Sequence, residues 1–213
     1  MTVNLLKRLE SSVASFRLTL QGLQANHQNA LDKIAKFQST GKADTFTDNT
    51  AAFEDADFDD DEPTEVDDDG ESSTGGKVRI DLGDMDLLSW QYDLRADLDV
   101  IEALLAEMQK ITPADDAKLQ HIKAQIEEKL ANPINPGNRK LLIFTAFADT
   151  ANYLYENLAN DLLQTHGLHS GKVTGTHEPK TTLKLASNPR QGIDFQTMLT
   201  LFSPQSKEKA VIL

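Results

Sequence analysis

The chain has 213 residues, with 21 Lys and Arg against 34 Asp and Glu, so its formal net charge is −13. The acidity is local, because the segment 44–71 holds fourteen acidic residues and no Lys or Arg. That segment carries a charge of −14, so the rest of the chain has a net charge of +1. The charge therefore does not exclude a nucleic-acid partner. The lack of cysteine excludes a disulfide framework, a Cys-ligated zinc site and thiol catalysis.

The first residues do not follow the pattern of a targeting segment. A signal peptide has a basic stretch followed by an apolar one, and Met1–Arg8 lacks that order. No apolar run in the sequence approaches membrane-spanning length. We therefore expect a soluble, cytoplasmic protein without a membrane partner.

A long amphipathic helix is predicted over residues 5–37. Its apolar positions recur at spacings of three and four, as on one buried helix face: Leu5, Leu9, Val13, Phe16, Leu20, Leu23, Ala30 or Leu31, Ile34 and Phe37. The opposite face carries basic residues, and residues 1–43 sum to +4: Lys7, Arg8, Arg17, Lys33 and Lys36 lie there. Two interpretations stay open. The basic face contacts DNA or a partner, or the helix is only a brace.

The acidic segment 44–71 is predicted to be disordered. Its runs of like charge repel one another, and its few apolar residues bury too little surface to offset chain entropy. Ser, Thr and Gly at 72–76 extend this segment into a linker. After the linker, Val78, Ile80 and Leu82 alternate with polar or charged residues, which favours a short extended piece.

Two further helices are predicted before residue 132. A second apolar stripe, which can pack along the first as an antiparallel hairpin or coiled-coil-like pair, consists of Leu87, Leu94, Leu98, Ile101, Leu105 and Met108. Thr112 is expected to cap the next helix, with Pro113 at its first position. The buried face of that helix holds Leu119, Ile122, Ile126 and Leu130. The Asn and Pro residues at 132–137 then indicate a domain boundary.

The pattern changes after that boundary. Residues 140–147 form a nearly continuous apolar run, as expected of a strand buried on both faces of a parallel sheet. Asp149 is the expected N-cap of a helix that ends at His166 and Gly167. A strand at 171–175, a short helix near 193–202 and a third strand at 210–213 complete an α/β unit.

Several segments resemble one known family. They are Leu5–Ser12, Asp116 with Lys118-Leu119, Leu141–Thr150 with Tyr153-Leu154, Gly175-Thr176, and positions between Phe195 and Pro204. In this order they resemble the inter-lobe region and the first half of the second RecA-like lobe of Swi/Snf-like ATPases of helicase superfamily two. The chain departs from the family at residue 146, which is Ala where Gln is usual.

The resemblance implies an internal fragment of a DNA-dependent ATPase that translocates on duplex DNA. The phosphate-binding loop, the acidic Mg-binding box and the arginine finger of such motors are missing, so ATP and Mg are implied for the full-length parent only. The fragment is expected to bind neither and not to hydrolyse ATP alone. Catalytic residues are not expected, because no complete set of groups for phosphoryl transfer is present. A metal site is not expected either, because His166, His169 and His177 lack a matching carboxylate spacing.

Together these inferences predict an α/β fold, in which a long helical hairpin or coiled-coil-like insertion precedes a partial parallel three-layer RecA-like lobe. The expected divisions are a first helical arm at 1–43, a disordered acidic linker at 44–76, a second helical arm at 77–135 and the partial lobe at 136–213. The abrupt end of the lobe predicts an exposed sheet edge. Self-association through that edge or through the helices is expected.

Contact with the nucleic-acid backbone is the role that the resemblance leaves to this fragment. Loops of the second lobe in such motors meet phosphates through hydroxyls, backbone N–H groups and helix N-termini. The candidates by position are Thr145, Thr150, Gly175, Thr176, Lys180 and Arg190. Without a nucleic acid, the same residues are ordinary strand-end, helix-start, turn and surface residues. The aromatic side chains interpreted as core are Phe144, Phe147, Tyr153 and Tyr155.

A competing hypothesis is a helical protein-interaction module without enzymatic activity. Its acidic tract would engage basic partners or compete with DNA for basic surfaces of the same chain. The amphipathic stripes demand burial and do not decide between the two hypotheses.

Overall fold

The computed structural model describes residues 2–41, 45–48, 78–175, 178–184 and 193–203. Contacts divide the chain into two compact units, Met1–Ile111 and Thr112–Leu213, which are described in turn. The boundary expected after residue 135 therefore lies inside the second unit. No helix in the described ranges combines the length and the apolar character needed to cross a membrane.

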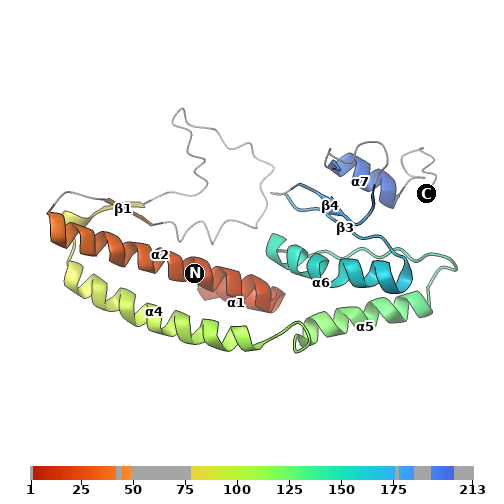
Figure 1. Ribbon diagram of the computed structural model, residues 1–213, viewed down its shortest axis with the longest axis horizontal. Helices are drawn as coiled ribbons and strands as arrows, with labels where there is room; N and C mark the ends of the chain where they lie inside the picture. Colours follow the sequence, from red (N-terminus) through yellow and green to blue (C-terminus); the bar gives the residue numbers. More distant parts are fainter. Residues whose placement is uncertain (1, 42–44, 49–77, 176–177, 185–192, 204–213) are drawn as a thin grey trace. The chain divides into compact units, whose positions relative to one another are not determined.

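The first unit is a helical hairpin. Helix α1 spans Thr2–Ser11, α2 spans Val13–Thr40 and α4 spans Leu87–Lys110. Figure 1 shows α2 and α4 side by side and running in opposite directions. The antiparallel pairing predicted from the two apolar stripes is confirmed.

Two clusters of buried side chains close this hairpin. One joins the first half of α2 to the second half of α4 and contains Phe16, Leu20, Leu23, Ile101 and Leu105. The other joins the second half of α2 to the region where α4 begins and contains Ala30, Ile34, Leu82 and Leu94. Burying one large aliphatic side chain contributes about 1.5–3 kcal/mol. Packing of these faces, rather than helix propensity, therefore stabilises the pair.

The single helix predicted over residues 5–37 is interrupted at Ser12. The backbone there is extended, with φ −162° and ψ 151°, and the Ser12 hydroxyl accepts a hydrogen bond from the N–H of Ser15 at 3.0 Å. Ser12 is thus the N-cap of α2, a role that satisfies an otherwise unpaired N–H group. At the other end, Gly41 has a left-handed φ of 61° and donates its N–H to the Phe37 carbonyl. This geometry ends the helix.

A two-stranded antiparallel ribbon lies between α2 and α4 in the sequence. Strand β1 spans Thr45–Asp48, β2 spans Val78–Asp81, and a 3₁₀ turn, η1, spans Leu82–Asp84. The register pairs Thr45 with Asp81 and Asp48 with Val78. The predicted extended piece after residue 77 is confirmed. Four residues of the segment predicted to be disordered form β1, and the acidic runs at 59–62 and 67–69 lie outside the described residues.

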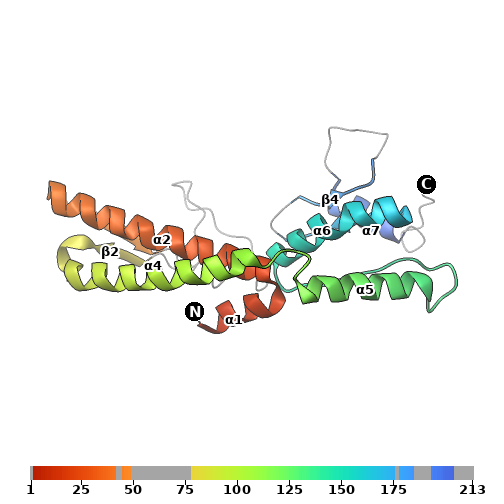
Figure 2. The same cartoon turned by 60° about the horizontal axis from the view of Figure 1, so that its bottom comes forward.

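The described residues of the second unit form three helices and a short ribbon. Helix α5 spans Ala117–Ala131, α6 spans Ala148–His166 and α7 spans Phe195–Phe202. Helices α5 and α6 pack through Leu119, Ile126, Leu154 and Leu158, and Figure 2 shows the two helices lying along each other. Strands β3 (Gly171–Lys172) and β4 (Lys180–Thr181) pair antiparallel.

The prediction of an α/β fold with a partial parallel three-layer RecA-like lobe is wrong for the described residues. These residues form a mostly helical structure with two separate two-stranded antiparallel ribbons, and they contain no parallel sheet. Residues 140–147 form no strand, and Leu142, Ile143 and Phe144 are 64%, 44% and 85% exposed. A buried parallel strand needs a hydrogen-bonded neighbour and covered faces. Here β3 pairs with β4, and the predicted strand at 210–213 lies outside the described residues.

Candidate functional site

The residues predicted to contact nucleic acid differ in their exposure to solvent. The Thr145 hydroxyl donates to the Phe147 carbonyl at 2.8 Å, and Thr150 is buried in the first turn of α6. Gly175 and Lys180 are exposed. Thr176 and Arg190 lie outside the described residues. Of the described candidates, Gly175 and Lys180 are thus the ones that face solvent.

The start of α6 differs from the prediction. Phe147, not Asp149, is its N-cap residue, and the Phe147 side chain makes no capping hydrogen bond. Asp149 lies in the first turn instead, where its carboxylate complements the positive end of the helix dipole. Phe147 is buried, as expected for a core aromatic residue, whereas Phe144 is exposed and does not belong to the core.

Lys172 is a buried cation that the sequence interpretation missed. It is 7% exposed, and its Nζ donates to Oδ1 of Asn152 on α6. Burial is the main cause that lowers the pKa of Lys172; the neighbouring Lys180 ammonium lowers it further, and Glu156 raises it. Lys180 is also its register partner across the β3/β4 ribbon. The Lys172–Asn152 hydrogen bond holds the β3/β4 ribbon against α6. Of the two paired lysines, Lys172 is buried and Lys180 is exposed.

The segment resembling Asp-x-Lys-Leu has a structural role here. Asp116 is buried and caps α5, since its Oδ1 accepts hydrogen bonds from the N–H groups of Lys118 and Leu119, both at 3.0 Å. Its Oδ2 accepts a hydrogen bond from the Tyr153 hydroxyl on α6, also at 3.0 Å. Asp116, rather than Thr112, therefore begins α5. The same carboxylate ties α5 to α6.

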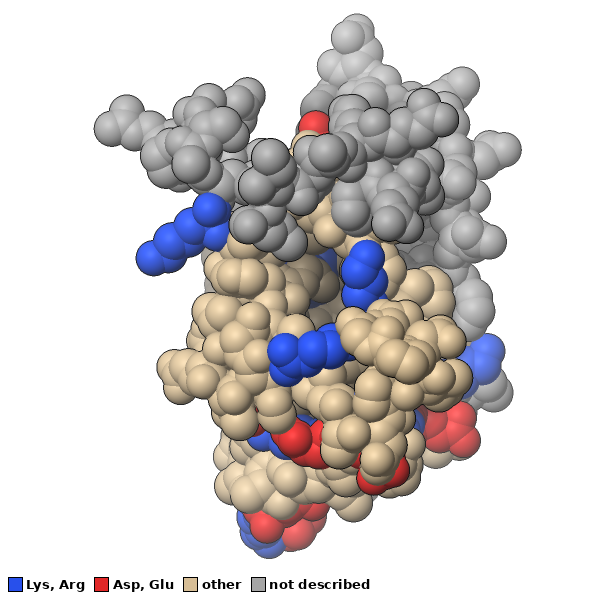
Figure 3. Space-filling view, turned by 90° about the vertical axis from the view of Figure 1, so that its right-hand side faces the viewer, with Lys and Arg blue, Asp and Glu red and all other residues tan. Residues whose placement is uncertain are grey.

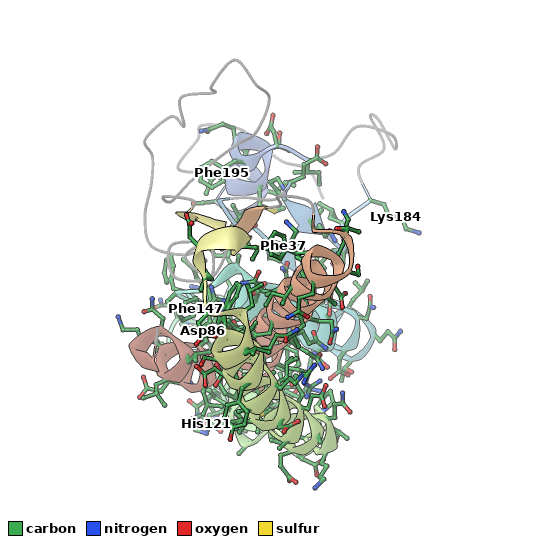
Figure 4. All side chains as sticks on the ribbon, turned by 90° about the vertical axis from the view of Figure 1, so that its left-hand side faces the viewer. Phe37, Asp86, His121, Phe147, Lys184 and Phe195 are labelled. Carbon is green, nitrogen blue, oxygen red and sulfur yellow. The ribbon has the colours of Figure 1, made fainter. Side chains whose placement is uncertain are left out.

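On the face drawn in Figure 3, the Lys and Arg side chains do not gather into one patch: they stand apart among uncharged side chains in its upper part and beside Asp and Glu in its lower part. Lys184 is exposed, and Figure 4 shows its side chain extending away from the ribbon. Binding to a nucleic-acid backbone without sequence preference depends on several cations acting together. The described residues on this face do not form a continuous patch of that kind.

Two of the three histidines considered as a metal group, His166 and His169, make ordinary polar contacts. His166 Nε2 lies 2.7 Å from Oε1 of Glu127, and His169 Nδ1 lies 3.2 Å from the Thr182 hydroxyl. Within the described ranges, no group of three or more His, Cys, Asp or Glu side chains is placed to hold a metal ion. His177 lies outside those ranges.

The basic face predicted for the first helix is partly used inside the first unit. Arg8 is 5% exposed. One guanidinium nitrogen of Arg17, Nη2, donates to the carbonyls of Met108 at 2.7 Å and Ile111 at 3.1 Å. A cation at these carbonyls complements the negative end of α4. Arg17 therefore serves the hairpin, which favours the brace interpretation for this residue.

A second apolar face of α4 was not identified from the sequence. Its members recur at intervals of four residues and are largely exposed: Leu88 (75%), Tyr92 (75%), Ala96, Val100 (60%) and Leu104 (39%). We call this row the α4 ridge. The four-residue spacing of the row can be read from the sequence. It was overlooked because the stripe that packs against α2 is by itself enough to predict that α4 is an amphipathic helix. Single exposed apolar residues are common, whereas a contiguous row is typical of an interaction surface.

A groove of about 520 Å³ lies between α2 and α4. Apolar side chains line part of it, among them Leu31 and Leu98, and its other walls are polar: Gln28, Asp32, Gln91, Arg95, Asp99 and Glu102. Three carboxylates against one guanidinium make this groove acidic. It borders the α4 ridge, because Arg95 follows Tyr92 by three residues and neighbours it on the helix surface.

Comparisons with protein-family models, with characterised proteins and with solved structures find no match to this chain.

Proposed function

We propose that the chain is a helical protein-interaction module, with the α4 ridge as its binding surface. The observation that carries this proposal is that α4 has two apolar faces. Leu94, Leu98, Ile101 and Leu105 are buried on the first, while the α4 ridge on the second remains exposed.

The scaffold behind the ridge supports this proposal. The α2/α4 clusters hold α4 over its whole length, and Arg17 fixes its last turn. A preformed helix loses little conformational entropy when a partner binds, so its exposed apolar area contributes more fully to affinity. A cytoplasmic location belongs to the same proposal.

The test uses a photo-crosslinking amino acid at position 92 of the full chain. In an extract of the source cells, we expect one defined adduct, which unlabelled wild-type chain competes away. A chain carrying Tyr92→Asp and Val100→Asp should not compete. The matched control carries the crosslinker at Leu18, which is 49% exposed on α2. The same adduct from both positions, or equal competition by both chains, would contradict the proposal.

Contact with duplex DNA, as part of a Swi/Snf-like ATPase, is a second candidate. The observation that favours it is Lys180, an exposed cation whose register partner Lys172 is bound to Asn152 of α6. In this proposal ATP and Mg belong to the full-length parent, and the chain alone has no ATPase activity.

Fluorescence anisotropy with a random-sequence duplex tests the DNA candidate. Affinity should fall steeply between about 50 and about 200 mM salt, as for any protein that neutralises phosphates. Lys180→Ala should weaken binding at every sequence tested and reduce the salt slope by about 1. Absence of binding at low salt would exclude backbone contact by this chain, and ATP turnover by the purified chain would contradict its expected inactivity.

A further inference from the structure

We infer that the occupant of the α4 ridge is a basic amphipathic helix of another protein, which packs across α4 with its apolar stripe on the ridge and its Lys or Arg residues against the flanking carboxylates. This inference rests on the proposed interaction function and names the class of partner.

The spacing of the ridge is the first reason for a helical partner. Leu88, Tyr92, Ala96, Val100 and Leu104 form one row in which each member is four residues from the next. Such rows are the ridges that fit into the grooves of a second helix in the commonest class of helix packing. In this class the two helix axes cross at about −50°, so a partner helix packs across the middle of the row, at Tyr92, Ala96 and Val100.

The charge around the ridge is the second reason, because it specifies a basic partner. Helix α4 carries five acidic residues, all exposed, against two basic ones. Residues three apart are neighbours on a helix surface, so Asp93 and Asp99 flank Ala96 and Asp97 flanks Val100. Glu107, beside Leu104, already pairs with Lys110 at 2.6 Å. The adjoining groove adds Asp32 and Glu102. Carboxylates therefore lie on both sides of the apolar row.

The same charges disfavour an α4-to-α4 dimer. Pairing two copies through this face would bring the acidic rows together, and like-charge pairs at an interface are destabilising. A Lys- or Arg-bearing helix would gain from the same arrangement, since long cationic side chains pack their methylene groups on apolar surface and reach carboxylates with their charged ends.

The experiment measures binding of two labelled synthetic peptides to the full chain by fluorescence anisotropy. Both peptides are amphipathic helices with the same Leu stripe, which is flanked by Lys in one and by Glu in the other. We expect the Lys-flanked peptide to bind at least about tenfold more tightly than the Glu-flanked peptide. In the Tyr92→Asp, Val100→Asp chain, affinity for the Lys-flanked peptide should fall by at least about tenfold.

The Asp substitutions separate ridge binding from attraction to the acidic segment 44–71. They make the chain more acidic, so an affinity that stays equal or rises would show that charge alone attracts the peptide and would overturn the inference. Leu18→Asp on α2 is the matched control and should change affinity by about twofold or less. Circular dichroism melting verifies that all three chains are folded.

Two further outcomes also count against the inference. Equal ridge-dependent binding of both peptides would leave the interaction module in place and exclude the basic partner. Sedimentation velocity gives the other: a wild-type dimer that the Tyr92→Asp, Val100→Asp chain does not form would assign the ridge to a second copy. Failure of both peptides to bind, together with a defined adduct at position 92, would mean that a partner exists but is not a basic helix.

Discussion

The two units differ in how completely they bury their apolar residues. In the first unit the stripes of α2 and α4 meet, and Ile34 and Leu82 are fully buried between them. In the second unit the apolar run after α5 leaves Leu142, Ile143 and Phe144 exposed. The stripe of a helix finds a complement in one neighbouring helix, whereas a buried strand requires paired strands and covering layers. Within the described residues, the helix stripes find such a neighbour, whereas the apolar run at 140–147 has no paired strand.

The largest expected effect tests this contrast directly. Ile34→Ala should lower the free energy of unfolding by about 2–5 kcal/mol, because it leaves a cavity in the α2/α4 core. Phe144→Ala should change it by about 0.5 kcal/mol or less, because this side chain is exposed. Urea denaturation followed by circular dichroism measures both. A comparable loss from Phe144→Ala would mean that the run at 141–144 is covered in solution, and the contrast between the units would disappear.

In the second unit, Asp116 adds a polar link between α5 and α6 to their apolar contact. Asp116→Ala should lower the free energy of unfolding by about 2 kcal/mol, since it removes the cap of α5 and leaves the Tyr153 hydroxyl without its acceptor. Tyr153→Phe isolates the second contact and should cost about 1 kcal/mol. Urea denaturation is again the measurement. If both variants match wild type, the α5/α6 contact depends on apolar packing alone.

Arg17 provides a polar contact at the end of α4 in the first unit, which can be removed by substitution. Arg17→Met keeps much of the side-chain volume and removes the donors to Met108 and Ile111, so we expect a loss of about 1 kcal/mol. Hydrogen exchange should accelerate in the last turn of α4 and remain unchanged near its start. Lys36→Met, an exposed site on the same helix as Arg17, is the control. Uniform acceleration along α4 would indicate a general loss of stability instead of a lost terminal contact.

The smallest effect concerns pH. Hydrogen bonds from Thr112, first from its side chain and then from its backbone N–H, lower the pKa of Asp115 below 3.8. The folded state thus binds fewer protons than the unfolded state near this pH, and the stabilisation is present above pH 3.8 and lost as pH falls through the lower folded pKa. The urea midpoint of Asp115→Asn should therefore lie below that of wild type at neutral pH and approach it in acid. A gap that widens in acid would contradict this.

Helix positions could be predicted from the sequence because their signals are local. The spacing of apolar residues places α2, α4, α5 and α6, and Gly167 marks the end of α6 with a left-handed φ of 65°. The start of α6 could not be predicted in the same way. Phe147 occupies the N-cap position without a capping side chain, so the polar signal used to place a helix start pointed two residues too far, to Asp149.

Contacts that depend on tertiary structure explain the other differences. Lys172 and Asn152 are twenty positions apart, and no local sequence pattern predicts the hydrogen bond between their side chains. Ser12 lies within an apolar stripe that continues on both sides, so periodicity conceals the break. The α4 ridge is a different case, since Leu88, Tyr92, Val100 and Leu104 are visible in the sequence. The ridge was overlooked because the prediction assigned only one apolar stripe to each helix.

The β1/β2 ribbon has a consequence for how this chain tolerates change. Its register pairs Asp48 with Val78, so the chain leaves β1 and enters β2 at one point of the first unit. The entropic cost of closing a loop grows only by about 0.6 kcal/mol for each doubling of its length. A change in the number of residues between Asp48 and Val78 should therefore cost the α2/α4 hairpin little free energy, so an affinity tag inserted there should leave the first unit folded.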